Sequence, residues 1–247
     1  MLQSLSMSVI QVRKDRERAA REELILDHAQ QTLLKDGFQN LNLDDLAEAV
    51  EYSKGTLYLH FKTKEDIALA VATRAQRHRA DFFERALEFR GRSRERIRAV
   101  GFACCHFANV YPDYYNVEMM LKSASFWEKA DEVRQHQHAM QAGRCFRVMH
   151  RLVTEGLQAG ELPPGKYSPE RIVFAIASTA IGSHIMGRNA HALLMAGIDD
   201  PLKPLCDNVN MLLDGLNWKP LTDEMDYDAV DRRIKKEIFP EANWFKN

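Results

Sequence analysis

The chain has 247 residues, of which 45% are hydrophobic and 28% charged, and its formal net charge is −1. This apolar share is large enough to offset the entropy of ordering, which excludes disorder of the whole chain. Twelve glycines and four cysteines exclude a collagen-like chain and a disulfide-rich scaffold. The longest apolar stretch, Ile172–Met186, is interrupted by polar residues and falls short of the roughly 20 residues that a membrane span needs.

The chain shows no sign of export or of metal binding. Residues 1–10 lack the basic flank and cleavage site of a secretory signal, so we expect a cytoplasmic protein with no membrane partner. Four cysteines without metal-type spacing are expected to be free thiols in a reducing compartment. We therefore predict no metal site and no cofactor. These cysteines are Cys104, Cys105, Cys145 and Cys206.

Positive charge is concentrated in three segments although the total is near zero. Residues 13–21 carry five bases and two acids, and residues 52–64 carry three bases and no acid. Residues 74–98 carry nine arginines and four acids. Binding of a polyanion needs local rather than total positive charge, so the pattern allows nucleic-acid binding. Solvated helix surfaces explain the third segment equally well.

Helical periodicity dominates the chain and strand signals are nearly absent, which predicts an all-α fold. Asn42, Ser53, Ser93 and Ser168 are expected to cap helices, and Thr63 with Asp66 resembles a capping box. Pro112 is expected to break a helix. The expected helices cover about residues 18–35, 43–50, 54–60, 64–89, 93–111, 117–126, 130–159, 169–197, 201–215 and 226–238.

The helices expected at 43–50 and 54–60 are separated only by the turn Glu51-Tyr52-Ser53. Helices this short cannot bury their apolar faces alone, so the first helix must complete a three-helix unit. In such a helix-turn-helix unit the third helix can lie in a DNA major groove. Leu57 and Phe61 are four residues apart and should face inward, with Leu59 partly covered.

The remaining side chains of the third helix are expected to project outward as hydrogen-bond donors to phosphates and base edges. They are Lys54, Thr56, Tyr58 and His60. Gly55 leaves this surface without a side chain and would allow DNA to approach the backbone closely. Simple tolerance of a glycine in the helix is the alternative.

The segments 43–50 and 53–66 resemble the N-terminal domain of TetR-family transcriptional regulators. The family pattern is S-K-G-T-L-Y-x-H-F followed by K-x-K-E, and the resemblance covers about residues 20–70. It implies a homodimer with an N-terminal helix-turn-helix domain and a larger helical domain for ligand binding and dimerisation. Transferred residue by residue, the resemblance assigns DNA contacts to Asn42, Ser53, Lys54, Gly55, Thr56, Tyr58, His60 and Lys64.

Glu51 departs from the family pattern, which often has glycine in this turn. If the turn requires a positive φ, Glu51 costs about 1 kcal/mol. The domains are expected at residues 1–66, with residues 1–16 as a flexible arm, and at residues 67–247, ending in an acidic tail at 219–247.

Aromatic and methionine side chains are concentrated between residues 102 and 127, a composition that can line an adaptable apolar cavity. Ordinary core packing is the alternative for each of them. Small and apolar residues on the helices near 169–197 and 201–215 suit a four-helix dimer interface, with burial inside a monomer as the alternative. The candidate ligand contacts are Phe102, His106, Met120, Trp127 and His184.

These features predict a dimeric, sequence-specific DNA-binding transcriptional regulator. It would bind a near-palindromic operator in double-stranded DNA and act as a repressor that an unknown small, largely apolar effector releases. The alternative is a DNA-binding dimer without a small-molecule effector, controlled by a protein partner. No catalytic residues are predicted, because the sequence has no G-x-S-x-G turn and no glycine-rich phosphate loop after a strand.

Overall fold

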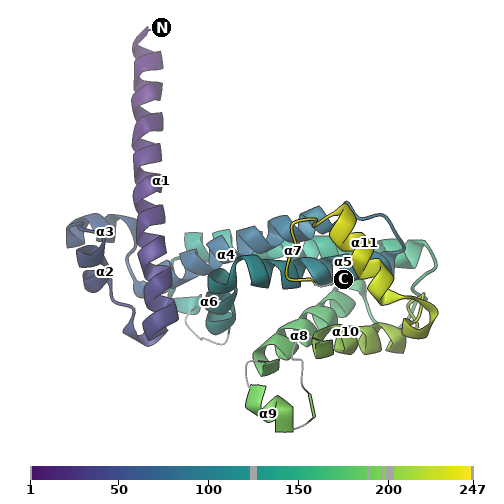
Figure 1. Cartoon of the computed structure of the whole chain (residues 1–247). Helices are drawn as coiled ribbons and strands as arrows, with labels where there is room; N and C mark the ends of the chain where they lie inside the picture. Colours follow the sequence, from purple (N-terminus) through teal and green to yellow (C-terminus); the bar gives the residue numbers. More distant parts are fainter. Residues whose placement is uncertain (1, 123–126, 188–189, 196, 199–202, 246–247) are drawn as a thin grey trace. The chain divides into compact units, whose positions relative to one another are not determined.

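The computed structural model describes residues 2–122, 127–187, 190–195, 197–198 and 203–245. Its regular structure within these residues is entirely helical, which confirms the all-α class. No described helix is both long and apolar enough to cross a membrane. The α-helices of Figure 1 are α1 (Leu2–Asp36), α2 (Leu43–Ala49), α3 (Lys54–His60), α4 (Lys64–Ala86), α5 (Ser93–Val110), α6 (Pro112–Lys122), α7 (Glu132–Gln158), α8 (Pro169–Gly187), α9 (Ala190–Met195), α10 (Lys203–Gly215) and α11 (Tyr227–Glu237).

The chain divides into two compact units. The first unit contains residues 1–75 and 113–139, and the second contains residues 76–112 and 140–247. Helices α4 and α7 contribute residues to both units. The boundary expected near residue 66 divides the chain differently, because side chains of α6 such as Val117 and Leu121 are buried in the same core as α1 to α3.

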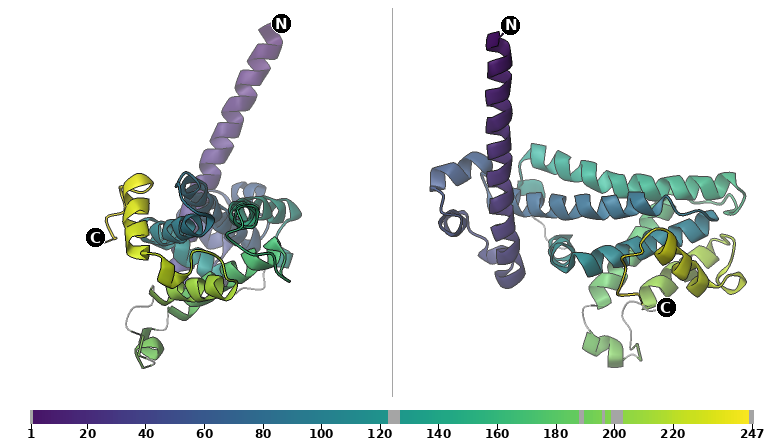
Figure 2. Two further views of the ribbon diagram at one scale, coloured as in Figure 1. Left: turned by 90° about the vertical axis from the view of Figure 1, so that its right-hand side faces the viewer. Right: turned by 45° about the horizontal axis from the view of Figure 1, so that its top comes forward.

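Helix α1 begins at Leu2, so the arm expected at residues 1–16 is helical rather than irregular. The whole of residues 2–36 lacks glycine and proline, which leaves nothing in the sequence to end the helix early. Glu17 also lies 3.5 Å from Arg13 and 3.7 Å from Arg21, one turn away on either side. Figures 1 and 2 show the N-terminal half of α1 extending beyond α2 and α3.

Local capping signals locate the helix starts of the first unit. The Asn42 side chain accepts a hydrogen bond from the Asp44 N–H (2.9 Å), and Ser53 Oγ accepts from the Thr56 N–H (3.1 Å). The capping box of α4 is also present, because Asp66 N–H donates to Thr63 Oγ1 and Thr63 N–H donates to Asp66 Oδ2. These starts agree with those predicted from sequence.

Three predicted helix ends of the second unit differ from the structure. Ser93 lies inside α5 rather than capping it, and its hydroxyl binds Glu161 and accepts from the buried Trp218 indole (2.8 Å). Pro112 follows the end of α5, as predicted, but it also begins α6, which was expected only from residue 117; proline is tolerated at a first helical position. The helix expected to reach residue 197 ends at Gly187 and is followed by α9. The predicted start at Pro201 and the side chain of Cys206 lie outside the described residues.

The second unit is built around one apolar core from α5, α7, α8, α10 and α11. Helix α8 packs along α10, and α11 packs on α5 (Figure 2). A Cβ on Gly156 would lie 2.7 Å from the Trp218 ring, so glycine is required where α7 passes this indole. Phe239 and Ala242, both fully buried, show that the acidic tail is part of this core.

Candidate nucleic-acid interface

The turn between α2 and α3 ends α2 with a Schellman motif. Tyr52 N–H donates to Ala47 O (2.9 Å) and Glu51 N–H donates to Glu48 O (3.0 Å). In this motif the residue after the C-cap adopts a left-handed conformation, and Glu51 has φ 57°. The same positions after α7 and α10 are occupied by Gly160 and Asn217, the residue types that favour this conformation. The positive φ considered from the sequence is therefore present, on a glutamate.

Helix α3 turns an apolar face to the core and a polar face away from it. Leu57 and Phe61 are buried, as predicted. Ser53, Lys54, Gly55 and Tyr58 are exposed, and Thr56 is half-buried with its hydroxyl 2.9 Å from Ser53 Oγ. The exposed face thus offers hydroxyl groups and one ammonium group, which are donors for phosphate oxygens and base edges.

Lys54 is held in place before any DNA arrives. Its Nζ donates to Asp44 Oδ2 at 2.6 Å, and this hydrogen bond raises the pKa of Lys54 above its usual value. Both side chains are largely exposed, and exposed ion pairs contribute little to stability. A phosphate can therefore replace Asp44 as the partner of Lys54 at low cost.

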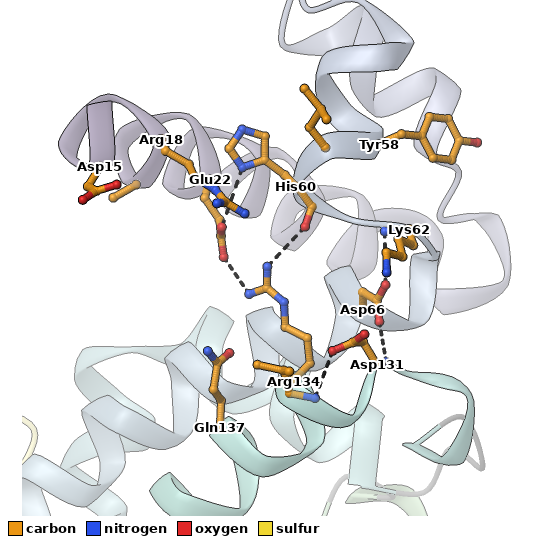
Figure 3. Close-up of a pocket in the computed structure, with 13 residues that line it drawn as sticks. Asp15, Arg18, Glu22, Tyr58, His60, Lys62, Asp66, Asp131, Arg134 and Gln137 are labelled. Carbon is orange, nitrogen blue, oxygen red and sulfur yellow. Dashed lines mark hydrogen bonds and ion pairs between the residues drawn. The ribbon is translucent and has the colours of Figure 1, made fainter. Parts of the chain in front are cut away.

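His60 does not project outward, so this part of the sequence prediction is wrong. Its side chain is only 4% exposed and faces α1, with Nδ1 3.7 Å from Glu22 Oε2 (Figure 3). Burial lowers the pKa of His60, because it opposes protonation more than Glu22 favours it. The reason is helical geometry: His60 lies three residues after Leu57, and residues three apart share a face.

Arg134, at the start of α7, joins this buried end of α3 to α1. Its guanidinium donates to Glu22 Oε1 (2.6 Å) and to the His60 carbonyl (3.3 Å), and it lies 4.6 Å from the centre of the Phe61 ring. Glu22, His60 and Arg134 line a cleft of about 490 Å³ whose walls carry both signs of charge (Figure 3). Sequence analysis missed Arg134, since nothing local indicates a contact with residues more than 70 positions away.

Lys64 occupies the base of the interface rather than its exposed surface. Its Nζ donates to the carbonyls of Gln39 (3.1 Å) and Phe38 (3.4 Å) and lies 4.8 Å from the centre of the Phe38 ring. An ammonium group has three donors, so one remains for a phosphate. In the structure, Lys64 binds the carbonyl groups of the residues that follow α1.

The basic segment 13–21 lies entirely on the exposed part of α1. Every side chain from 11 to 21 is exposed, so its five bases face solvent along a continuous helix. This surface and the outer face of α3 both belong to the first unit. Both carry exposed bases, and duplex binding depends on local positive charge.

The candidate ligand contacts are distributed over both units. Met120 and Trp127 belong to the first unit, where Trp127 packs on the His138 ring with centroids 4.9 Å apart. Phe102, His106 and His184 belong to the second unit. Spacing along the sequence did not indicate that the candidates belong to two units.

Phe102 and His106 lie under the C-terminal tail. The Phe102 ring centre is 5.1 Å from that of Trp244, whose indole N–H donates to His106 Nδ1 (2.9 Å). His106 Nε2 lies 3.3 Å from Glu241, and burial lowers the pKa of His106. His184 Nε2 is 3.9 Å from the Cys104 thiol. His106 therefore has the partners of a core histidine, and the tail supplies them.

Among the described residues, no group of three or more metal-ligating side chains is close enough to hold an ion.

Comparison with known proteins connects this geometry to a family. Residues 25–71 match the sequence model of bacterial regulatory proteins, tetR family. The chain is 23% identical over 144 residues to the fatty acid metabolism regulator protein of Bacillus subtilis, covering 57% of this chain and 70% of that protein.

Two solved structures share the fold over about four fifths of the chain. A tetR-family regulatory protein from Rhodococcus RHA1 aligns with a TM-score of 0.61 at 18% identity, covering 80% of this chain and 97% of that one. SmeT, the repressor of the Stenotrophomonas maltophilia multidrug efflux pump SmeDEF, aligns with a TM-score of 0.55 at 18% identity, covering 78% and 89%, and a SmeT–triclosan complex also matches. Residues 25–71 thus match the sequence of the tetR family over the helix-turn-helix unit, and the chain shares the fold of these solved structures.

Proposed function

We propose that this regulator is a homodimeric repressor, acting in the cytoplasm, that binds a near-palindromic operator and leaves it when a small, largely apolar molecule binds the second unit. The observation that carries the proposal is the outer face of α3, which presents Lys54, Thr56 and Tyr58 away from the core, in the same unit as the exposed basic part of α1.

Dimerisation is supported by apolar side chains that the second unit leaves uncovered. Phe174 and Met186 on α8 are each 67% exposed, and Met211 on α10 is 63% exposed. Helices α8 and α10 pack on one another (Figure 2), so these side chains lie on one pair of helices. A second copy of the same pair would remove this surface from water in a symmetric four-helix contact.

The dimer is tested by light scattering coupled to gel filtration. Phe174→Arg should convert the dimer to monomer and abolish operator binding, because a charge would be buried at the contact. Phe146→Arg is the matched control: Phe146 is 48% exposed on α7, and its replacement should leave the dimer intact. A Phe174→Arg variant that remains dimeric would exclude this interface.

Ligand control is supported by the SmeT–triclosan complex and by the aromatic surroundings of α5 in this chain. We assign the ligand contacts of the second unit to Phe102, His106 and His184. Met120 and Trp127, in the first unit, would respond to the ligand through the shared helices rather than touch it. His184→Ala should weaken release of the duplex by the ligand, whereas His191→Ala, an exposed site on α9, should not.

Release would follow from the helices that the two units share. Within the first unit, Asp131 N–H, just before α7, donates to Asp66 Oδ1 on α4 (2.7 Å), and Arg134 on α7 donates to the carbonyl at the end of α3. A shift of α4 or α7 would therefore act on α3. Two recognition helices must lie about 34–36 Å apart to enter successive major grooves. A tenfold loss of operator affinity needs about 1.4 kcal/mol of preference for the released state.

The ligand is sought by mass spectrometry of small molecules released from the purified, denatured protein. A stoichiometric apolar compound that also dissociates a bound duplex supports the proposal. Duplex binding that no co-purified compound affects, but that a protein from the same cells abolishes, favours control by a protein partner.

A further inference from the structure

Leu59 is the residue of α3 that neither the fold nor the assigned contacts explain. It is 77% exposed, more than any other large apolar side chain described in the first unit. A leucine exposed this far on a free surface gains nothing from burial. Sequence reasoning expected it to be partly covered, and the structure contradicts that expectation.

Helical geometry places Leu59 at the outermost line of α3. Leu57 and Phe61 mark the inward face, being 0% and 1% exposed. Successive residues are rotated by about 100°, so a residue two positions from each of these points nearly opposite to the core. Gly55 lies one turn before Leu59 on the same outward line. The two residues together form the ridge of α3 that would enter a groove most deeply.

Gly55 is an independent sign that this ridge meets a partner. A Cβ built on Gly55 would meet nothing nearer than Ser53 Oγ at 3.8 Å, and its φ is not in the left-handed region. Neither packing nor backbone conformation within the chain therefore requires glycine here, although glycine weakens a helix relative to alanine. At Gly55 a partner surface can approach the backbone of α3 closely. One turn later, Leu59 can contact the same surface with an apolar group.

The chemistry of the surrounding residues indicates what that surface is. Tyr58, 49% exposed, and Lys54 offer a hydroxyl and an ammonium group beside the ridge, which suit phosphates. The base edges of a major groove are polar with one exception, the C5-methyl group of thymine. An isobutyl group at the centre of a groove-facing surface can gain by burial only against that methyl.

We propose that Leu59 is a specificity-determining residue that reads the methyl group of one thymine in each operator half-site. This inference rests on the proposed binding of α3 in the major groove. Burying one methyl is expected to change affinity about fourfold for each half-site.

The test uses the full-length protein and duplexes that differ by a single methyl group. A duplex is first selected by the wild-type chain from random sequences. Each thymine of one half-site is then replaced singly by deoxyuridine, which removes only the methyl group. For the wild type, replacement at one position should weaken binding about fourfold, and for Leu59→Ala the thymine and deoxyuridine duplexes should bind equally at that position.

Two variants keep the result interpretable. Leu24→Ala makes the same substitution on α1, where the side chain is 39% exposed, and it should retain the full penalty for deoxyuridine. Leu59→Met keeps an apolar side chain and should retain most of the loss of affinity caused by deoxyuridine. A Leu59→Ala protein with an undiminished deoxyuridine penalty, or a wild type insensitive to every thymine methyl, would overturn the inference while leaving DNA binding intact. Failure to select any duplex would overturn the proposed function and this inference together.

Discussion

Replacing Glu51 by glycine should stabilise the protein and at the same time strengthen DNA binding. The stability effect comes from the backbone: a residue with a Cβ pays about 1 kcal/mol to adopt the left-handed conformation, and Glu51 has φ 57°. Glycine relieves that cost but adds freedom to the unfolded chain, which returns part of the gain. The net increase in the free energy of unfolding is therefore expected at about 0.5 kcal/mol.

Two further variants separate the backbone effect from the charge effect. Glu51→Asn also tolerates the left-handed conformation and should stabilise by a similar amount, whereas Glu51→Gln removes the charge but keeps the strain. All three should bind duplex DNA more tightly at low salt, since each removes a negative charge from the turn before α3.

Urea unfolding of the full chain, followed by circular dichroism, measures the stability of the three variants. Fluorescence anisotropy of a labelled duplex at two salt concentrations measures their binding. If Glu51→Gln stabilises as much as Glu51→Gly, or if Glu51→Gly destabilises, the assignment of strain to this turn is wrong.

Three other predictions concern the first unit. Burial lowers the pKa of His60, so the unfolded state binds more protons than the folded state below about pH 6.5. The loss of unfolding free energy caused by His60→Gln should therefore become smaller as the pH falls from 7.5 to 5. A loss that does not change with pH would contradict this prediction. Arg134→Ala should lower the free energy of unfolding in urea by about 1–2 kcal/mol, because Glu22 and the His60 carbonyl lose their hydrogen-bond donor. Arg134→Lys should restore only part of this stability. Equal stability of Arg134→Ala and the wild type would exclude a structural role for Arg134. Lys54→Ala should lower the salt dependence of duplex binding by about one unit of slope for each α3, and an unchanged slope would remove Lys54 from the phosphate contacts.

The helix-turn-helix unit was predictable from sequence because its signals are local. Asn42, Ser53 and the Thr63–Asp66 pair act within one helical turn, so their positions in the chain determine where α2, α3 and α4 begin. The positive φ at Glu51 was considered for a different reason, because the family that the segment resembles often has glycine in this turn.

The parts that sequence missed depend on contacts between distant residues. His60 was assigned outward from alternating positions, a period that suits a strand rather than a helix, and its neighbour Glu22 lies 38 positions earlier. The burial of His106 depends on Glu241 and Trp244, more than 130 positions later. No local pattern indicates such pairs, and for the same reason the sequence did not separate the candidate ligand contacts of the first unit from those of the second.

The central claim, that α3 reads a duplex in the context of a symmetric pair of subunits, is tested most directly by selecting random duplexes with the full-length protein and with Thr56→Ala. The account predicts that the wild type enriches an inverted repeat whose half-sites are centred about 10 base pairs apart, or a multiple of that distance. Thr56→Ala should enrich the same arrangement with altered base preference at a matching position in each half-site. Absence of enrichment, or an unsymmetrical site that Thr56→Ala leaves unchanged, would contradict the account.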